Sequence, residues 1–302
     1  MRSVGSVVRF VVGMCLASAF IAPAESAPLS DDEARIQLGR RLFYDADLSG
    51  DGSMSCASCH EQRHAFADGM PTHAGITDDA GVRNVPSLGN VGGLKTLTWL
   101  DQHITSLEQQ VSTPVFGHGP VEMGMPDWTT LLHRVSADAC YQKLFARAFK
   151  NENGRIDAHT VPEALAAFER TLISQNSLWD QAQKKQARLP DDAQRGATLF
   201  FGQAHCASCH SGSLFTDQSF HSINAAHPAR VRTPSLRNVG VTAPYLHDGS
   251  APTLSAALQA HTYSPALSPM DEQALEAFLQ TLTDPSFLHN PALALPPEGC
   301  PL

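Results

Sequence analysis

The sequence Cys56-Ala57-Ser58-Cys59-His60 decides the fold class, and it returns 150 residues later as Cys206-Ala207-Ser208-Cys209-His210. Cys-x-x-Cys-His is the attachment signal of c-type haem: the two thiols form thioether bonds to the haem vinyl groups, and the histidine binds the iron. A thioredoxin-like redox pair does not require the histidine. A zinc site would bind one ion with both cysteine pairs, whereas here each pair belongs to its own repeat. Two complete copies therefore predict two covalently bound haem c groups, with His60 and His210 as the proximal iron ligands.

The surroundings of the two motifs are repeated as well. Gly39-Arg40-Arg41-Leu42-Phe43 precedes the first motif, and Gly196-Ala197-Thr198-Leu199-Phe200 precedes the second. Downstream, the heptads Pro86-Ser87-Leu88-Gly89-Asn90-Val91-Gly92 and Pro234-Ser235-Leu236-Arg237-Asn238-Val239-Gly240 differ only at their fourth residue. The heptad proline follows the haem histidine by 26 residues in one copy and by 24 in the other. Such matches in the same order predict two related haem domains fused head to tail.

The domain boundaries that we predict are a signal segment at 1–27, an N-terminal haem domain at 28–180 and a C-terminal haem domain at 181–302. Arg2 and Arg9 form a positive segment that precedes a short apolar run of 12 residues. That run is shorter than the roughly 20 residues that a helix needs to cross a bilayer, and small residues follow it, as in a cleaved secretory signal. We therefore expect export to the periplasm and a mature chain that does not span a membrane.

The fold class that we predict is mainly α, with two cytochrome c-like haem domains in tandem and long loops. Ser30-Asp31-Asp32-Glu33 fits a capping box that opens a helix running toward Phe43, and Asp191-Asp192 opens the matching helix of the second half. Apolar residues at helical spacing predict further helices at 156–172 and 270–282. No stretch alternates long enough to require a sheet.

The segments outside these repeats give weaker signals. The polar stretch 181–190 is expected to link the halves, and the proline-rich tail after Asp284 is expected to wrap back across a domain. Of the seven cysteines, four belong to the two haem motifs and Cys15 belongs to the signal segment, which leaves Cys140 and Cys300. Export permits a disulfide between them, but sequence does not give the geometry, so a disulfide and two free thiols both stay open.

The charge of the chain excludes one class of partner. There are 21 basic and 30 acidic residues, a formal net charge of −9. Nucleic-acid binding needs clustered lysine and arginine, so we expect no nucleic-acid partner. An acidic surface would instead steer a basic protein partner. Composition does not separate an enzyme from an electron carrier.

The chain resembles the bacterial di-haem cytochrome c peroxidase family, which includes the MauG-type enzymes that oxidise a protein substrate. The resemblance covers the mature chain and rests on both haem motifs and on three further stretches, Asn84-Val85-Pro86-Ser87-Leu88, Gly119-Pro120-Val121-Glu122-Met123-Gly124 and Thr242-Ala243-Pro244-Tyr245-Leu246-His247-Asp248-Gly249-Ser250. It implies that hydrogen peroxide reacts at the N-terminal haem. The C-terminal haem then passes electrons from a small electron-donor protein, such as cytochrome c, or from a protein substrate.

The resemblance also implies roles for three side chains. Glu122 matches the distal glutamate of the peroxide site, where a carboxylate can move a proton between the two oxygens during O–O cleavage. Gln110 matches a distal glutamine. Trp99 matches the tryptophan that relays electrons between the haems, although Trp99-Leu100-Asp101-Gln102 departs from the family's usual Trp-Asp-Gly-Arg. Without the resemblance, the ordinary interpretations are a surface glutamate, a solvated helix residue and a core tryptophan.

A calcium site between the domains is a further implication. Asn84, Thr242 and Pro244 match the residues that hold the ion, the last two through backbone carbonyl oxygens, which calcium accepts. Only one direct side-chain ligand is implied, so calcium occupancy stays open.

The second axial ligand of the C-terminal haem departs from the family. The peroxidases have methionine there and the MauG-type enzymes have tyrosine, whereas this chain has His261, with Tyr263 two residues later as the alternative. We expect His261 to bind the iron opposite His210. A bis-histidine haem has a lower reduction potential than a histidine–methionine haem, which favours the MauG type.

The N-terminal haem is the second departure. Many family peroxidases block it with another histidine until the partner haem is reduced. The matching position falls near Ile76, and His73 is three residues out of register, so we expect an open iron. An electron carrier with both irons six-coordinate is the alternative, and Glu122 and Gln110 argue against it because a carrier needs no proton shuttle. The electron donor and the oligomeric state, a homodimer included, stay open.

Overall fold

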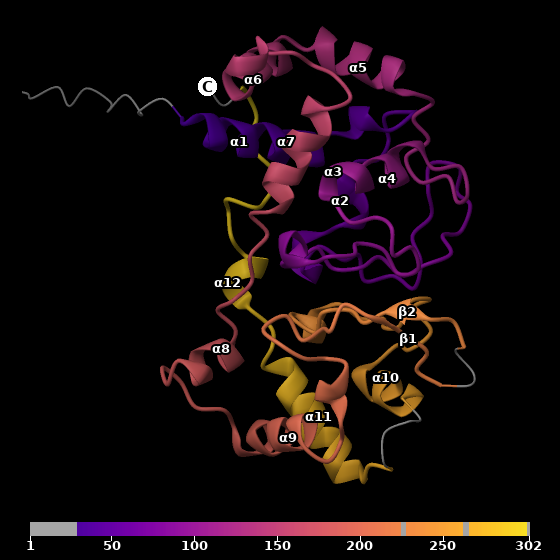
Figure 1. Ribbon diagram of the computed structural model, residues 1–302, viewed down its shortest axis with the longest axis vertical. Coiled ribbons are helices and arrows are strands. Elements are labelled where there is room, and N and C mark those ends of the chain that lie inside the picture. Colours follow the sequence, from indigo (N-terminus) through magenta and orange to yellow (C-terminus); the bar gives the residue numbers. More distant parts are fainter. Residues whose placement is uncertain (1–28, 225–227, 262–265, 301–302) are drawn as a thin grey trace, which may run out of the picture.

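The computed structural model describes residues 29–224, 228–261 and 266–300 and shows two mainly helical halves stacked one on the other (Figure 1). The predicted signal segment 1–27 and the alternative ligand Tyr263 lie outside the described residues. The mainly α fold is confirmed, since helices and loops account for nearly all of the described chain. None of the described helices combines the length and the apolar character that a membrane crossing requires.

The N-terminal half is built on α1 (Asp31–Phe43), which packs against α6 (Ala139–Ala148) and α7 (Thr160–Glu169). Apolar side chains of these helices form one buried cluster, in which the ring centroids of Phe43 and Phe168 lie 5.2 Å apart. Burial of such aromatic side chains supplies much of the stability of a domain this size. The shorter helices of this half are α2 (Cys56–Cys59), α3 (Leu107–Gln110), α4 (Ser112–Phe116) and α5 (Trp128–Ala137).

The helix ends in this half follow from local capping. The predicted capping box at Ser30 is present. α7 begins at Thr160, four residues later than predicted. The reason is that the Asp157 carboxylate accepts hydrogen bonds from the backbone amides of His159 and Thr160, both over 2.9 Å, and holds 156–159 in a turn. The sequence analysis did not predict α5 and α6.

The C-terminal half repeats the helix pair. α9 (Asp191–Phe201) packs against α11 (Pro269–Gln280), as α1 packs against α7, and both helices begin within one residue of their predicted positions. A second buried apolar cluster lies between them. The other elements are α8 (Leu178–Gln183), α10 (Leu254–Ala260), α12 (Pro285–Leu288) and the antiparallel strands β1 (Phe220–His221) and β2 (Val231–Arg232).

The predicted linker at 181–190 begins inside a helix. α8 is capped by Ser177, and its Trp179 packs edge-on against Phe278, with ring centroids 5.2 Å apart. One aromatic side chain anchors this short helix to the second cluster, and three of the other five residues of α8 are polar. For that reason the stretch has the composition of a linker although its first residues are helical.

A glycine at the same place in each repeat lets the paired helices approach closely. A Cβ atom added at Gly39 would lie 1.8 Å from the backbone oxygen of Ala164, and one added at Gly196 would lie 1.8 Å from that of Ala274. No side chain fits at that distance in a close-packed interior. The repeated glycine of Gly-x-x-Leu-Phe is therefore a requirement of helix packing.

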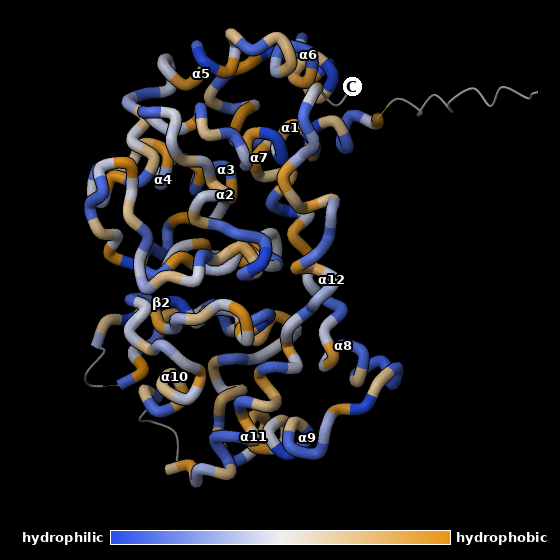
Figure 2. The backbone as a smooth tube through the Cα atoms, turned by 180° about the vertical axis from the view of Figure 1, so that it is seen from behind, coloured by the Kyte–Doolittle hydropathy of each residue, from blue (hydrophilic) through white to orange (hydrophobic). Residues whose placement is uncertain are grey.

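The tail wraps back to the N-terminal half, as expected. In both views the chain leaves α11, passes α12 and continues to the other half, where its last described residues lie near α6 (Figure 1 and Figure 2). Phe287 and Leu293 join the buried cluster of the N-terminal half. The buried Arg40 of α1 donates a hydrogen bond to the backbone oxygen of Ala294 over 2.6 Å. The last segment of the chain thus stabilises the first half.

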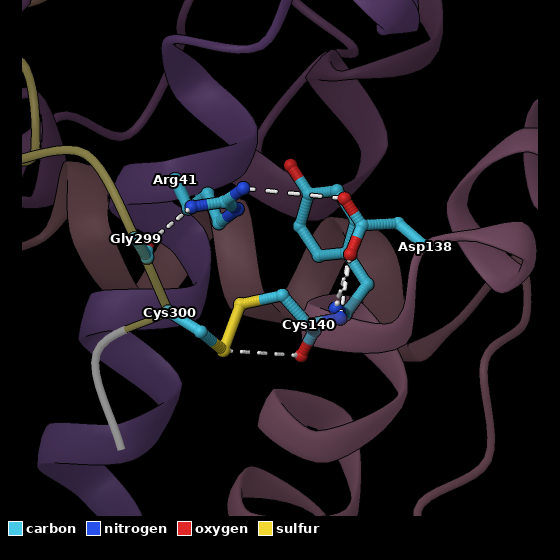
Figure 3. The surroundings of a disulfide bond; sticks show 6 residues. Arg41, Asp138, Cys140, Gly299 and Cys300 are labelled. Carbon is cyan, nitrogen blue, oxygen red and sulfur yellow. Dashed lines mark hydrogen bonds and ion pairs between the residues drawn. A yellow bond between two sulfur atoms is a disulfide. The ribbon is translucent and has the colours of Figure 1, made fainter.

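A disulfide between Cys140 and Cys300 fixes the end of this tail to α6 (Figure 3). The two Cα atoms are 5.6 Å apart, an ordinary separation for a disulfide. Arg41 supports the same contact, since its guanidinium donates to the backbone oxygen of Gly299 over 2.9 Å and pairs with Asp138. The structure therefore resolves the choice that the sequence left open.

Candidate haem sites

In the first haem motif, one ring nitrogen of the histidine is occupied by a hydrogen bond to the backbone. Cys56 and Cys59 lie at the two ends of α2, and His60 follows directly. Nδ1 of His60 lies 2.7 Å from the backbone oxygen of Phe66. Because a carbonyl only accepts, Nδ1 carries the proton and Nε2 keeps its lone pair for a metal ion. Burial lowers the pKa of His60, which favours the neutral imidazole that binds metals.

The second motif repeats this arrangement. Cys206 opens a 3-10 helix at Cys206–Ser208, and Nδ1 of His210 donates to the backbone oxygen of Phe215 over 3.1 Å. Burial, followed by the nearby His261, lowers the pKa of His210 to about 4. Both proximal histidines are therefore neutral at physiological pH, with Nε2 available.

The repeated heptads explain why the two histidines are held alike. Ser87 donates a hydrogen bond to the backbone oxygen of Ala65 over 2.5 Å, and Ser235 donates to that of Leu214 over 2.6 Å. Each acceptor residue directly precedes the residue whose carbonyl orients the proximal histidine. The heptad serine thus fixes the turn whose carbonyl sets the orientation of the proximal histidine ring. Hydrogen bonds of this kind orient a metal ligand without contacting the metal.

The heptad asparagines join the two halves. Asn90 and Asn238 both adopt the left-handed conformation, with φ of 61° and 62°. The Asn90 amide donates to the backbone oxygen of Ser174, and the Asn238 amide donates to the Ser174 hydroxyl, both over 3.0 Å. One buried serine between the repeats therefore holds both heptads.

A cavity of about 320 Å³ in the C-terminal half is lined by Cys206, Cys209, His210 and His261. His261 directly follows α10, and its Nδ1 donates to the backbone oxygen of Ala257 over 2.7 Å, so its Nε2 is also left for a metal. The ring centroids of the two histidines are 6.5 Å apart. That separation leaves room for one metal ion between them, because metal–imidazole bonds are about 2 Å long. These residues fit a haem whose iron lies between two histidines.

The far wall of this cavity comes from the N-terminal half. Trp99 is buried, lines the cavity, and donates from its indole nitrogen to the backbone oxygen of Asn84 over 2.8 Å. The backbone amide of Asn84 in turn donates to the backbone oxygen of His247 over 2.9 Å. Trp99 therefore lies at the seam between the halves, against the second haem cavity.

The three residues expected at a calcium ion, Asn84, Thr242 and Pro244, all line this cavity. The amide nitrogen of Asn84 donates to the backbone oxygen of Met70 over 2.9 Å, which leaves its side-chain oxygen as the atom that can bind a cation. An amide oxygen with backbone carbonyl oxygens is a donor set that suits calcium.

The loop that carries Glu122 is fixed to the first half by its backbone. The Glu122 carbonyl accepts from the Ile76 amide over 2.9 Å, and the Met123 carbonyl accepts from the Gly50 amide over 2.7 Å. A Cβ atom at Gly75 would lie 1.7 Å from the backbone oxygen of Val121. The Glu122 side chain is accessible to solvent, yet the protein around it raises its pKa by desolvation, an effect that nearby His73 opposes.

His73 connects this carboxyl to the first haem motif. Its Nδ1 lies 3.0 Å from a carboxylate oxygen of buried Asp68. Hydrogen bonds to Asp68 and then to the Cys59 thiol raise the pKa of His73 to about 10. His73 thus contacts Cys59 on one side and acts electrostatically on Glu122 on the other. Sequence reasoning singled out His73 but missed its partner Asp68, because nothing in the local sequence marks the pair.

The structure gives fewer contacts that bear on the predicted role of Gln110 than on the roles of the other predicted residues. It ends α3, its side chain is half-buried, and within the part of the chain that the structure describes no hydrogen bond joins it to Glu122. Its role remains a prediction from position.

Comparison with known proteins decides the family. Residues 33–188 match the family model described as di-haem cytochrome c peroxidase. The methylamine utilization protein MauG of Methylorubrum extorquens is 33% identical over 291 residues, 86% of this chain and 81% of that protein. The chain belongs to the di-haem cytochrome c peroxidase family.

Other members of the family are similar over most of their fold. The cytochrome c peroxidase Ccp of Escherichia coli is 27% identical and aligns over 86% of this chain and 61% of its own length. A solved structure of a MauG-like protein associated with microbial copper homeostasis superposes with a TM-score of 0.82 at 32% identity, over 93% of this chain and 99% of that one. This di-haem peroxidase is thus an oxidoreductase, and its family implies two haem c groups.

Replacing His261 by methionine is expected to raise the reduction potential of the C-terminal haem in this di-haem peroxidase. A thioether ligand raises the potential relative to a nitrogen ligand, within the roughly 0.8 V range that axial ligands span. A potentiometric titration followed by visible absorbance measures the shift, with Tyr263→Phe as the control that leaves it unchanged. A wild-type C-terminal haem that titrates well above zero millivolts, or a shift confined to Tyr263→Phe, would contradict His261 as the ligand.

Proposed function

We propose that this protein is a periplasmic di-haem peroxidase that reduces hydrogen peroxide at the N-terminal haem held by His60. Electrons reach that haem through the C-terminal haem, from a cytochrome c or from a protein substrate. The observation that carries the proposal is the position of His73, which is bound to Asp68, interacts with Cys59 and acts electrostatically on Glu122; this supports a titratable carboxyl near the first haem motif.

The protein's own residues supply the proton chemistry. When bound, the haem irons supply the electron transfer, and each turnover converts one hydrogen peroxide to two waters with two electrons and two protons. Glu122 takes a proton from one peroxide oxygen and returns it to the other, the task of a positioned acid–base group. His73, held protonated by Asp68, keeps positive charge beside this carboxyl. Gln110 orients peroxide through its amide.

Trp99 and the calcium ligands act at the seam. The buried indole of Trp99 lies against the second haem cavity while its backbone belongs to the first half, which supports a role in relaying electrons between the halves. Asn84, Thr242 and Pro244 would hold a calcium ion beside it and so keep the two halves in register.

A protein substrate is favoured over simple peroxide removal. The pairing of His210 with His261 favours a low-potential second haem, which accepts electrons poorly from a high-potential cytochrome and stabilises oxidised iron. The relatives named MauG are 30–33% identical to this chain, and those named cytochrome c peroxidase are 27–29% identical. The disulfide between Cys140 and Cys300 supports an oxidising compartment such as the periplasm.

The electron paramagnetic resonance spectrum of the oxidised holoprotein tests the open N-terminal site. We expect one high-spin ferric haem from His60 and one low-spin haem from His210 and His261. An electron carrier would show two low-spin haems. If two low-spin haems appear, the His73→Ala variant shows whether His73 is the blocking ligand. A new high-spin signal in that variant would mean that the enzyme needs reductive activation. An unchanged spectrum would mean that the protein is an electron carrier and not a peroxidase.

A further inference from the structure

One buried arginine lacks a partner for one of its donors. Arg40, Arg232 and Arg237 are the buried arginines of the described residues. Arg40 donates to backbone oxygens of the tail, and Arg237 forms a two-pronged pair with Asp180 at 2.9 and 3.0 Å. Arg232 is 3% exposed, and its Nη1 has no hydrogen-bond partner among the residues that the structure describes.

Arg232 faces the second haem cavity. It belongs to β2 and lines the cavity together with His210 and His261. Its backbone amide donates to the backbone oxygen of Trp99 over 2.9 Å, and its Nε donates to that of Thr98 over 3.2 Å. Two of its donors therefore hold the Trp99 segment, while Nη1 has no acceptor among the described residues.

Among the described residues, no charge compensates that of Arg232. Burial alone lowers its pKa to about 10, and no carboxylate of the described part of the chain acts on it. A guanidinium stays protonated at neutral pH even so, and an unpaired buried charge is strongly destabilising. Arg237, five residues later in the chain, shows the usual arrangement of a buried arginine: its two terminal nitrogens donate hydrogen bonds to the two oxygens of one carboxylate. An anion in the cavity would complete the same arrangement at Arg232.

We propose that Arg232 binds a carboxylate of the haem attached to Cys206 and Cys209, and that its bonds to Thr98 and Trp99 position the Trp99 segment against that haem. The inference rests on the presence of the second haem and not on the peroxidase reaction. Haem carries two propionate carboxylates, and a guanidinium fork matches carboxylate geometry. Arg232 is thus a cofactor-binding residue toward the haem and a positioning residue toward Trp99.

Pairing with a positive charge makes the second haem easier to reduce, because reduction adds an electron beside it. Arg232→Gln is therefore expected to shift the reduction equilibrium of the C-terminal haem about tenfold toward the oxidised form, which is about 59 mV for a one-electron couple. Arg230→Gln is the matched control: it removes the same charge two residues away, from an exposed side chain whose guanidinium donates hydrogen bonds to the Phe220 backbone oxygen. Spectroelectrochemical titration of the holoprotein measures both.

A second readout separates carboxylate binding from a general loss of charge. The propionate bending band in the resonance Raman spectrum should move in Arg232→Gln and in the charge-conserving Arg232→Lys, and should stay in place in Arg230→Gln. Haem content and far-UV circular dichroism check that each variant is folded and carries its haems. If Arg232→Gln is not folded or lacks haem, the Raman band of Arg232→Lys decides the test. An unchanged band in the Arg232 variants, or an equal potential shift in the Arg230 control, would overturn the proposal whether or not the protein consumes peroxide.

Discussion

Glu122→Gln is expected to lower kcat/KM for hydrogen peroxide by about 10²- to 10⁴-fold, the range that a positioned proton-transfer group contributes. Glutamine has nearly the same size and shape but cannot take up and return a proton. The loop should keep its place, because Ile76 is bonded to the Glu122 backbone and not to its side chain. The raised pKa of Glu122 gives the pH dependence its sign: wild-type activity should fall as the pH drops through a value above the usual glutamate range, since the carboxylate must accept a proton.

Stopped-flow absorbance with peroxide in excess measures the first reaction step directly. Glu152→Gln is the control, because Glu152 lies in the same half and pairs with Arg155 away from the haem motif. Both variants should retain two haems. If Glu122→Gln reacted with peroxide as fast as Glu152→Gln, Glu122 would not be the proton-transfer group, and the distal site would have to be assigned elsewhere.

Gly39→Ala and Gly196→Ala are each expected to destabilise the protein by about 1–3 kcal/mol, the usual cost of forcing extra atoms into a packed interior. Helix propensity alone predicts the opposite sign, since alanine is favoured over glycine in a helix by about 1 kcal/mol. The steric clash determines the sign of the stability change, because the new Cβ would lie 1.8 Å from a backbone oxygen that cannot move without its helix. The paired helices must separate, and the apolar cluster beneath them loosens.

Urea denaturation followed by circular dichroism measures this effect. Thr198→Ala is the matched control, because it changes an exposed residue of the same helix, α9, two positions from Gly196. The control should leave the denaturation midpoint unchanged or raise it slightly. A Gly196→Ala variant as stable as Thr198→Ala would mean that the helix pair does not need its close crossing.

The repeats made the framework of this fold predictable from sequence. Paired cysteines with an adjacent histidine specify covalent haem chemistry, and duplicated glycines and heptads specify that the surrounding structure is duplicated too. The structure gives these repeats a physical reason: Gly39 and Gly196 admit a crossing helix, and Ser87 and Ser235 fix the turn beside each proximal histidine. The helices α5 and α6 were missed although apolar residues recur in them at helical spacing, as at Leu131 and Val135.

The remaining features depend on contacts between distant segments. The disulfide joins residues 160 positions apart, and no local pattern gives their separation in space. Asp68 and His73 form a pair only because the loop between them turns back, and the Nη1 of Arg232, which lacks a partner among the described residues, is evident only once its burial is known. Such residues carry much of the chemistry of the site, but a single sequence contains no periodicity that marks them.

Peroxide consumption by the purified holoprotein, with reduced cytochrome c as donor and with and without prior reduction, tests the central claim most directly. We predict that peroxide changes the haem spectrum of the fully oxidised protein and is consumed without prior reduction. A long-lived oxidised state that cytochrome c scarcely discharges would support a protein substrate, whereas rapid oxidation of the cytochrome would support peroxide removal. A haem spectrum that does not respond to peroxide, before or after reduction, would contradict the peroxidase and leave an electron carrier.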